Sequence, residues 1–308
     1  MILDRSLAPN DIPPYLKKMK EMYEDLFSGG KGYRGALVHS ISMDLGLSEE
    51  NAVLLSTCIE YIHNSSLLHD DFVDDAELRR GKTTAWKKYG GGYAILGGDY
   101  LLAKVIKNLC SCDSVKLIDY TSGAILALVE GEWLQDACHN RGDVSKEEMA
   151  QVHALKTSAL FSWCFKAPAL LMDSSVSEED LRDFHRIGDL LGSLLQRSDD
   201  LLDYNIRNGE GKAYFKDLPS GYFNLFTICL LEGVDAKAKL EAFKCKSIEE
   251  LVSKFDLNID KTLKSFDEES EGMIKAVRSL IDENKFFSNE FKEELKEATS
   301  KIYWRSEA

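Results

Sequence analysis

Apolar residues recur at intervals of three and four positions through almost the whole chain, and only 5 of its 308 residues are proline. This spacing is the period of an α-helix with one buried face, whereas a half-buried strand would alternate apolar and polar residues. Because proline interrupts helix interiors, its scarcity allows the helices to be long. The sequence therefore predicts an all-α protein without a convincing β-strand.

The segments that join the periodic runs are short and polar, and neither a composition break nor an internal repeat divides the chain. The run 49–74 is apolar nearly all round, which is typical of a buried central helix. We therefore expect one domain over residues 1–308. The helices that we expect are 13–28, 35–46, 49–74, 93–110, 113–138, 145–172, 177–205, 219–232, 235–244, 247–254, 258–283 and 288–304.

Charge and hydropathy restrict the partners. The chain has 38 Lys and Arg against 52 Asp and Glu, and this net charge of −14 disfavours nucleic acid and anionic membrane surfaces. An anionic ligand therefore needs a local basic pocket. No apolar run approaches the ~18 residues that a transmembrane helix requires, and the first residues lack the pattern of a secretory signal. We expect a cytoplasmic protein.

Four aspartates lie within six positions in the stretch LLHDDFVDDAELRRGK, residues 67–82. On a helix, Asp70, Asp71 and Asp74 share one face, with Asp75 beside them. A solvated acidic helix end is the simpler interpretation, but the preceding run is too apolar to favour it. Hard oxygen donors at this spacing suit Mg²⁺, which commonly also binds phosphate oxygens.

The same spacing occurs again in LLQRSDDLLDY, where it brings together Asp199, Asp200 and Asp203. If the two helices face each other across a bundle, six carboxylates surround a space for two or three Mg²⁺ ions and a diphosphate. Several cations, each unremarkable alone, together supply what a diphosphate needs beyond metal. These cations are Lys31, Arg34, Arg79, Arg80, Lys156 and Lys212.

Over residues 29–227 the chain resembles the trans-isoprenyl diphosphate synthases. The resemblance rests on motifs that follow the family's order: GGKGYRG, IHNSSLLHDDFVDDAELRRG, GGDYLLA, EGEWLQD, KTSALF, LLQRSDDLLDY and GKAYFKDL. It implies a single-domain orthogonal helical bundle of the isoprenoid synthase type around a deep central cavity, usually in a homodimer. It also implies Mg²⁺-dependent head-to-tail condensation of isopentenyl diphosphate with an allylic diphosphate (dimethylallyl, geranyl or farnesyl).

The resemblance also implies residue roles. The metal ligands are Asp70, Asp71, Asp74, Asp199 and Asp200, with Asp203 acting through water or as support. The allylic diphosphate matches Arg79, Lys156 and Lys212. The pocket for isopentenyl diphosphate matches Lys31, Arg34, His63 and Arg80. Thr157 and Gln196 match polar groups beside the carbocation.

This inventory suits the chemistry. Loss of pyrophosphate from an allylic diphosphate develops negative charge on oxygen, which Mg²⁺ and preplaced cations stabilise. The positioned double bond of isopentenyl diphosphate then attacks the allylic cation. In the family the departed pyrophosphate is thought to take the final proton, so we assign His69, beside Asp70, to structure.

In this family the residues four and five before the first aspartate limit the product, because they lie about one helical turn further down the cavity. Here they are Ser66 and Ser65, which are small and leave the tunnel open. The next barrier falls on Leu102, Ala103 and Ile106. This combination favours geranylgeranyl diphosphate as the product.

The chain departs from the family pattern in four places. Tyr222 and Asn224 stand where a lysine and a hydroxyl are usual, and Lys216 is a candidate to compensate. Leu195 replaces an aromatic residue, and Arg197 replaces an apolar one, within reach of Asp199. These changes keep open a catalytically slow or regulatory subunit that binds prenyl diphosphates. A terpene cyclase of the same fold is the other alternative, which the intact second aspartate motif argues against.

Overall fold

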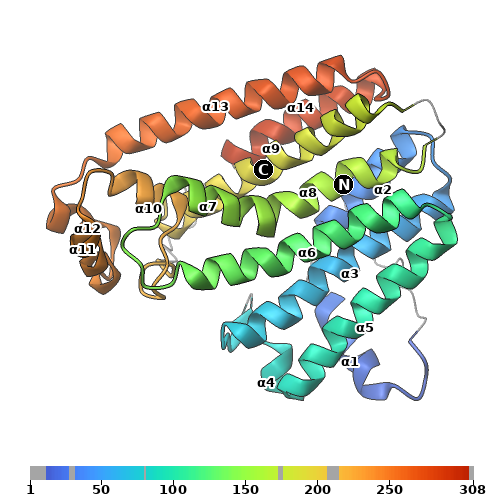
Figure 1. Ribbon diagram of the computed structural model, residues 1–308, viewed down its shortest axis with the longest axis horizontal. Helices are drawn as coiled ribbons and strands as arrows, with labels where there is room; N and C mark the ends of the chain where they lie inside the picture. Colours follow the sequence, from blue (N-terminus) through green and yellow to red (C-terminus); the bar gives the residue numbers. More distant parts are fainter. Residues whose placement is uncertain (1–11, 28–31, 80, 173–175, 207–214, 305–308) are drawn as a thin grey trace. The chain divides into compact units, whose positions relative to one another are not determined.

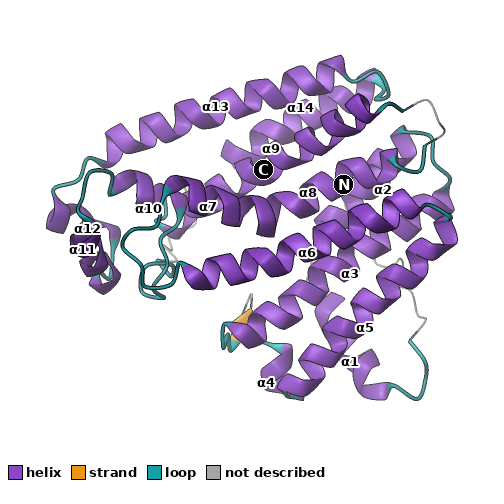
Figure 2. Cartoon of the chain, viewed as in Figure 1, coloured by secondary structure: helices purple, strands orange, loops and turns teal. Residues whose placement is uncertain are grey.

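The computed structural model describes residues 12–27, 32–79, 81–172, 176–206 and 215–304, and helices dominate these ranges (Figures 1 and 2). The prediction of an all-α protein is confirmed. The longer helices are α1 (Lys17–Phe27), α2 (Tyr33–Asp44), α3 (Glu49–Val73), α5 (Gly91–Leu109), α6 (Val115–Ala137), α8 (Ala159–Ala169), α9 (Glu178–Asp203), α13 (Ile259–Glu283) and α14 (Asn289–Trp304). The shorter ones are α4 (Ala85–Tyr89), α7 (Lys146–His153), α10 (Leu225–Leu230), α11 (Ala236–Lys239) and α12 (Ile248–Phe255).

The chain forms two compact units. Unit 1 comprises Met1–Leu126 and Leu160–His185, and unit 2 comprises Ala127–Ala159 and Arg186–Ala308. Helices α6, α8 and α9 contribute residues to both units. The first aspartate motif therefore belongs to unit 1 and the second to unit 2.

In unit 1, α3 lies along α5 and packs closely against it (Figure 1). Two glycines of α5 let neighbouring helices approach closely, Gly98 on the side of α3 and Gly97 on the side of α1. A Cβ on Gly98 would lie 2.2 Å from Nε2 of His69, and one on Gly97 would lie 2.2 Å from Cε of Met22. Ser48 caps the first turn of α3 by accepting a hydrogen bond from the backbone N–H of Asn51.

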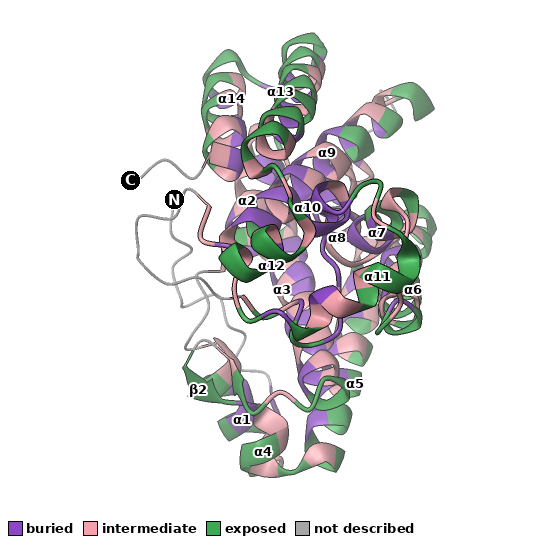
Figure 3. Ribbon diagram, turned by 90° about the vertical axis from the view of Figure 1, so that its left-hand side faces the viewer, coloured by how far each residue is buried: buried purple, intermediate pink, exposed green. Residues whose placement is uncertain are grey.

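Buried residues predominate in α8, whereas most residues of α13 and α14 are exposed or intermediate (Figure 3).

In unit 2, α13 packs against α14 and α10. The rings of Phe226 and Phe266 meet edge to face, with centroids 5.4 Å apart. The guanidinium of Arg197, on α9, reaches α13 and donates from Nη2 to the carbonyl oxygen of Phe266 at 2.8 Å. The sequence pattern put Arg197 within reach of Asp199, whereas its guanidinium lies against α13.

The sequence predicted the positions of the short elements least well. Strands β1 (Leu78–Arg79) and β2 (Lys82–Thr83) form a two-stranded antiparallel hairpin, although no strand was expected. Residues 145–172 are not one helix, because the π-helical turn η3 (Ala154–Ser158) separates α7 from α8. The helix expected from residue 219 begins only at Leu225, since Asn224 caps it.

None of the described helices combines the length and the hydropathy that crossing a bilayer requires. All seven cysteines have free thiols.

Candidate functional site

The first aspartate motif occupies the C-terminal end of α3, where the helix dipole is negative. Asp71 is buried and 6% exposed, Asp70 is half-buried and Asp74 is exposed. Arg79 on β1 donates from Nε to Oδ1 of Asp71 at 2.7 Å. Burial raises the pKa of Asp71, and the neighbouring guanidinium opposes that rise. The carboxylates therefore gather at a helix end that favours a cation.

The two serines before this motif face different ways. Ser65 is 1% exposed and donates a hydrogen bond to the carbonyl oxygen of Gly98 at 3.0 Å. His69, one turn later on α3, also lies against α5, with Nε2 3.2 Å from the carbonyl oxygen of Ile95. Ser66 shares its helix stripe with Asp70. Ser65 thus packs against backbone rather than bordering open space, and Ser66 is the better candidate for the product channel.

The other expected chain-length residues lie on α5. Leu102 and Ile106 are half-buried and Ala103 is exposed, whereas Leu101 and Val105 are buried. The three candidates therefore occupy the more accessible side of this helix.

Arg34 and His63, expected at the isopentenyl diphosphate, contact each other in unit 1. Nη1 of Arg34 lies 3.2 Å from Nε2 of His63, and the guanidinium carbon is 5.2 Å from the centre of the Phe161 ring. The family resemblance thus pairs two residues that also meet in the structure. Lys31, Arg80 and Lys212 fall outside the described residues.

The second aspartate motif lies at the end of α9, in unit 2. Asp199 is exposed, while Asp200 and Asp203 are 2% and 7% exposed. Asp200 accepts hydrogen bonds from Nε2 of Gln196 at 3.2 Å and from the backbone N–H of Leu225 at 2.9 Å. Asp203 accepts from the backbone N–H of Lys216 at 2.8 Å. The backbone at Lys216 and at Leu225 is therefore hydrogen-bonded to the motif itself.

A further carboxylate lies beside this motif. Burial and the nearby charge of Asp203 raise the pKa of Asp217 to about 6. Burial, and next the charge of Asp217, raise the pKa of Asp200 well above its usual range. Asn224 donates from Nδ2 to Asp217 at 3.0 Å. Such a group of buried and half-buried carboxylates is stabilised by a cation.

Sequence reasoning missed Asp217, although it lies in the quoted motif GKAYFKDL. It also gave His153 no role at the site. The imidazole of His153 is 8% exposed and lies 3.9 Å from Oδ1 of Asp200. Burial, reinforced by the charge of Arg197, lowers the pKa of His153 to about 4. His153 is thus a neutral neighbour of the second motif.

The π-helical turn η3 carries the expected Lys156 and Thr157. Such turns widen a helix locally and are frequent at functional sites. Thr157 donates from Oγ1 to Oε1 of Gln196 at 2.8 Å, and Gln196 donates in turn to Asp200. Three of the expected residues therefore form one hydrogen-bonded chain.

The ammonium of Lys156 is paired with α6. It donates to Oε2 of Glu132 and, at 3.1 Å, to Oε1 of Gln135. Neither residue had been singled out, because EGEWLQD was used only as a motif of the resemblance.

The departures from the family pattern have local explanations. Asn224 caps α10 by accepting from the backbone N–H of Thr227 at 2.9 Å. The ring of Tyr222 packs on His139, with centroids 4.9 Å apart. Lys216 is exposed and Leu195 is half-buried.

Among the described residues, no three His, Cys, Asp or Glu side chains form a group ready to hold a metal ion. Mg²⁺ is usually held by one or two carboxylates together with water and phosphate oxygens rather than by an all-protein cage. Each aspartate motif offers such carboxylates, and the burial of Asp200 and Asp217 favours a cation nearby. The donor set therefore fits a Mg²⁺ ion.

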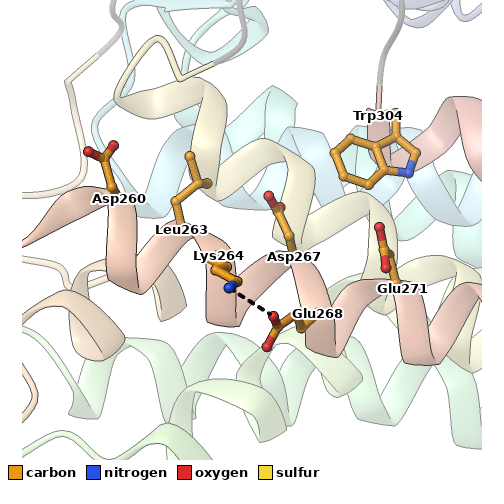
Figure 4. A pocket seen from close by; sticks show the side chains of 7 residues that line it. All are labelled: Asp260, Leu263, Lys264, Asp267, Glu268, Glu271 and Trp304. Carbon is orange, nitrogen blue, oxygen red and sulfur yellow. Dashed lines mark ion pairs between the residues drawn. The ribbon is translucent and has the colours of Figure 1, made fainter.

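A separate hollow of about 400 Å³ lies on α13 beside Trp304 (Figure 4). Its walls are largely acidic, and within it Lys264 pairs with Glu268 at 4.0 Å. It contains none of the expected site residues.

Comparison with known proteins gives the class. Residues 16–254 match the family model described as polyprenyl synthetase. The chain is 34% identical over 202 residues to octaprenyl diphosphate synthase of Escherichia coli, an alignment that covers 65% of this chain and 61% of that protein. It is 33% identical over 267 residues to geranylgeranyl diphosphate synthase of Sulfolobus acidocaldarius, covering 82% of this chain and 79% of that protein.

The fold is likewise shared with a solved structure. A decaprenyl diphosphate synthase from Rhodobacter capsulatus superposes with a TM-score of 0.84 at 23% identity, covering 99% of this chain and 94% of that one. The Escherichia coli match spans less than two thirds of that relative's length. The chain belongs to the polyprenyl synthetase family, as the sequence motifs predicted.

Proposed function

We propose that the protein is a prenyltransferase that condenses isopentenyl diphosphate head to tail with an allylic diphosphate to give a longer trans-prenyl diphosphate. The observation that carries this proposal is the pair of aspartate motifs at the ends of α3 and α9, both within the matched family region. We propose that residues 1–308 act as one synthase domain.

The metal in this proposal is Mg²⁺, with two or three ions per active site. Asp70, Asp71, Asp74, Asp199 and Asp200 are its proposed ligands. Bound there, it would stabilise the negative charge that develops on the departing pyrophosphate. Asp203, whose carboxylate already accepts backbone N–H groups, acts as support.

Cationic side chains bind the two diphosphates. Arg79, Lys156 and Lys212 are proposed to hold the allylic diphosphate. Lys31, Arg34, His63 and Arg80 are proposed to hold isopentenyl diphosphate. An arginine grips two phosphate oxygens at once, whereas a lysine acts as a point charge.

Thr157 and Gln196 are proposed to lie beside the allylic cation. Thr157 donates its hydroxyl proton in a hydrogen bond of 2.8 Å to Gln196. The lone pairs of the hydroxyl oxygen then remain to face the developing positive charge. In this way two neutral side chains favour the cation without offering it a nucleophilic anion.

We propose geranylgeranyl diphosphate as the product. The small side chain of Ser66, on the stripe of Asp70, supports a channel that stays open one turn below the motif. The relatives are named as farnesyl, geranylgeranyl and octaprenyl diphosphate synthases, so the product length of this protein has to be measured.

The test is to incubate the purified protein with Mg²⁺, isopentenyl diphosphate and dimethylallyl, geranyl or farnesyl diphosphate, and to size the products. A twenty-carbon product is the expected result. Release of pyrophosphate with a cyclic hydrocarbon would indicate a cyclase instead. Binding of prenyl diphosphates without condensation of any primer would indicate a regulatory subunit and refute the proposal.

We propose that the working form is a homodimer. On α6, Val129 and Trp133 are 52% and 72% exposed and lie one turn apart. Exposed apolar side chains of this size are typical of a surface that a second copy covers. Light scattering on wild type and on Trp133→Arg checks this, and a wild-type mass of one chain would refute it.

A further inference from the structure

We propose that Glu132 is a positioning residue for the allylic diphosphate, acting through Lys156. Together with Gln135 it holds two of the three ammonium N–H groups and leaves the third for a phosphate oxygen. This inference rests on the proposed function, and it adds a residue to which the family resemblance gave no role.

The geometry of the ammonium supports this role. Lys156 Nζ contacts one oxygen of Glu132 and, at 3.1 Å, the amide oxygen of Gln135, so two acceptors on one helix fix it. The side chains of Lys156 and Glu132 are only 21% and 19% exposed, which distinguishes this pair from an ion pair on open surface. An ammonium carries three donors, so one remains.

The backbone around Lys156 is also fixed. A Cβ on Gly131, the neighbour of Glu132, would lie 2.7 Å from Cγ of Lys156 and 2.9 Å from Cβ of Leu155. On the other side, a Cβ on Gly192 of α9 would lie 2.5 Å from Cα of Ser158. Glycines on two helices therefore let η3 lie close to both, and the lysine stem starts from a defined place.

A preplaced ammonium matters because lysine is otherwise a flexible point charge. Hydrogen bonds to Glu132 and Gln135 hold the ammonium in one position before a diphosphate binds. The diphosphate can bind the third N–H group without displacing either acceptor. Truncating Glu132 would free the ammonium to adopt other positions. The allylic diphosphate would then bind more weakly, whereas isopentenyl diphosphate, bound by other cations, would not.

The experiment compares wild type, Glu132→Ala, Glu132→Gln, Lys156→Ala and the double variant E132A/K156A. Glu130→Ala, at an exposed position on the same helix, is the matched control. KM for the allylic diphosphate should rise about tenfold in Glu132→Ala, the loss expected for one charge-assisted hydrogen bond. KM for isopentenyl diphosphate should stay within twofold. Glu132→Gln, which keeps an acceptor, should recover most of the loss.

The double variant separates positioning from general structure. If Glu132 acts through Lys156, adding Glu132→Ala to Lys156→Ala should change the allylic KM by less than twofold. Equal losses in both backgrounds, equal effects on both substrates, or tighter allylic binding in Glu132→Ala would each overturn the proposal.

A binding measurement keeps the inference separate from the proposed activity. Titration with inorganic pyrophosphate and Mg²⁺ should show the same ranking of variants in Kd. If wild type fails to condense any primer yet pyrophosphate binding still depends on Glu132 through Lys156, the activity is refuted and the positioning role stands. If the Kd of Glu132→Ala equals that of wild type, the positioning role is refuted.

A backbone variant gives an independent check. Gly131→Ala should displace Lys156 and raise the allylic KM as Glu132→Ala does. Gly123→Ala, on the same helix, has no atom within 4 Å of the added Cβ and should leave both KM values unchanged. Wild-type behaviour of Gly131→Ala would contradict the proposed close fit.

Discussion

Arg197 donates a hydrogen bond from Nε to Oγ of Ser270 at 2.7 Å, and this contact joins the helix of the second aspartate motif to α13. The guanidinium carbon also lies 3.6 Å from the centre of the Phe266 ring. An arginine at a position where the family usually has an apolar residue therefore has a structural explanation, in the packing of two helices.

We predict that Arg197→Leu lowers the free energy of unfolding by about 2 kcal/mol, because hydrogen bonds to Ser270 and to the Phe266 carbonyl are lost in a buried setting. Urea titration measures the change. Glu269 also pairs with Arg197, but its side chain is 57% exposed, so Glu269→Gln should cost less than about 1 kcal/mol. A larger loss in Glu269→Gln than in Arg197→Leu would contradict this account.

We predict that Gly98→Ala destabilises the protein by about 1–3 kcal/mol, since the new methyl group would meet the ring of His69. His69 would have to leave its contact with the Ile95 carbonyl. Gly92→Ala, on the same helix and with no atom within 4 Å, is the control and should be neutral or stabilising by up to about 1 kcal/mol. Thermal unfolding gives the melting temperatures of both variants. Similar melting temperatures would contradict the prediction that the Gly98 site is closely packed.

We predict that Ser66→Phe shortens the product by about one isoprene unit, because a helical turn of about 5.4 Å is close to the length of a prenyl unit. Chromatography of the products measures this. Ser65→Phe should instead destabilise the fold, since its hydroxyl already lies 3.0 Å from the Gly98 carbonyl oxygen. Normal stability with a shorter product in Ser65→Phe alone would reverse the assignment of the two serines.

We predict that Asp70→Asn and Asp199→Asn each lower kcat by at least about 100-fold, with a smaller effect on KM, because the charge that they help to stabilise develops in the transition state. Steady-state kinetics over a range of Mg²⁺ concentrations provide the measurement. Asp75→Asn is the control: its φ of 51° lies in the left-handed region, which asparagine tolerates. Proportionate losses in kcat and in substrate affinity would argue against a role in the transition state.

Much of this molecule follows from its periodicity and motifs. The apolar run before Asp70 predicted α3 almost to the residue, and the family motifs predicted the class that the comparisons show. Long amphipathic segments are predictable because burial of one face dominates their energetics. The linked residues Thr157, Gln196 and Asp200 were also all named in advance.

The side-chain contacts that the sequence did not predict are mostly with residues distant in the sequence. The side chain of Arg197 could be placed only once α13 was known to pack on α9, and Ser65 only once α5 was known to lie against it. Glu132 was not predicted to have a role because its partner, Lys156, lies 24 residues away in the sequence. The hairpin at Arg79 is too short for a periodic signal.

The widened turn at Ala154–Ser158 also changes how the segment 145–172 should be compared with other chains. A π-helical turn accommodates one residue more than an α-helix, so the faces after it are rotated by about 100° relative to the faces before it. A helical wheel drawn through this segment as one continuous helix would put the residues of α8 on the wrong sides. A gap of a single residue in an alignment here would therefore mark a change of helix type rather than a deletion in a loop.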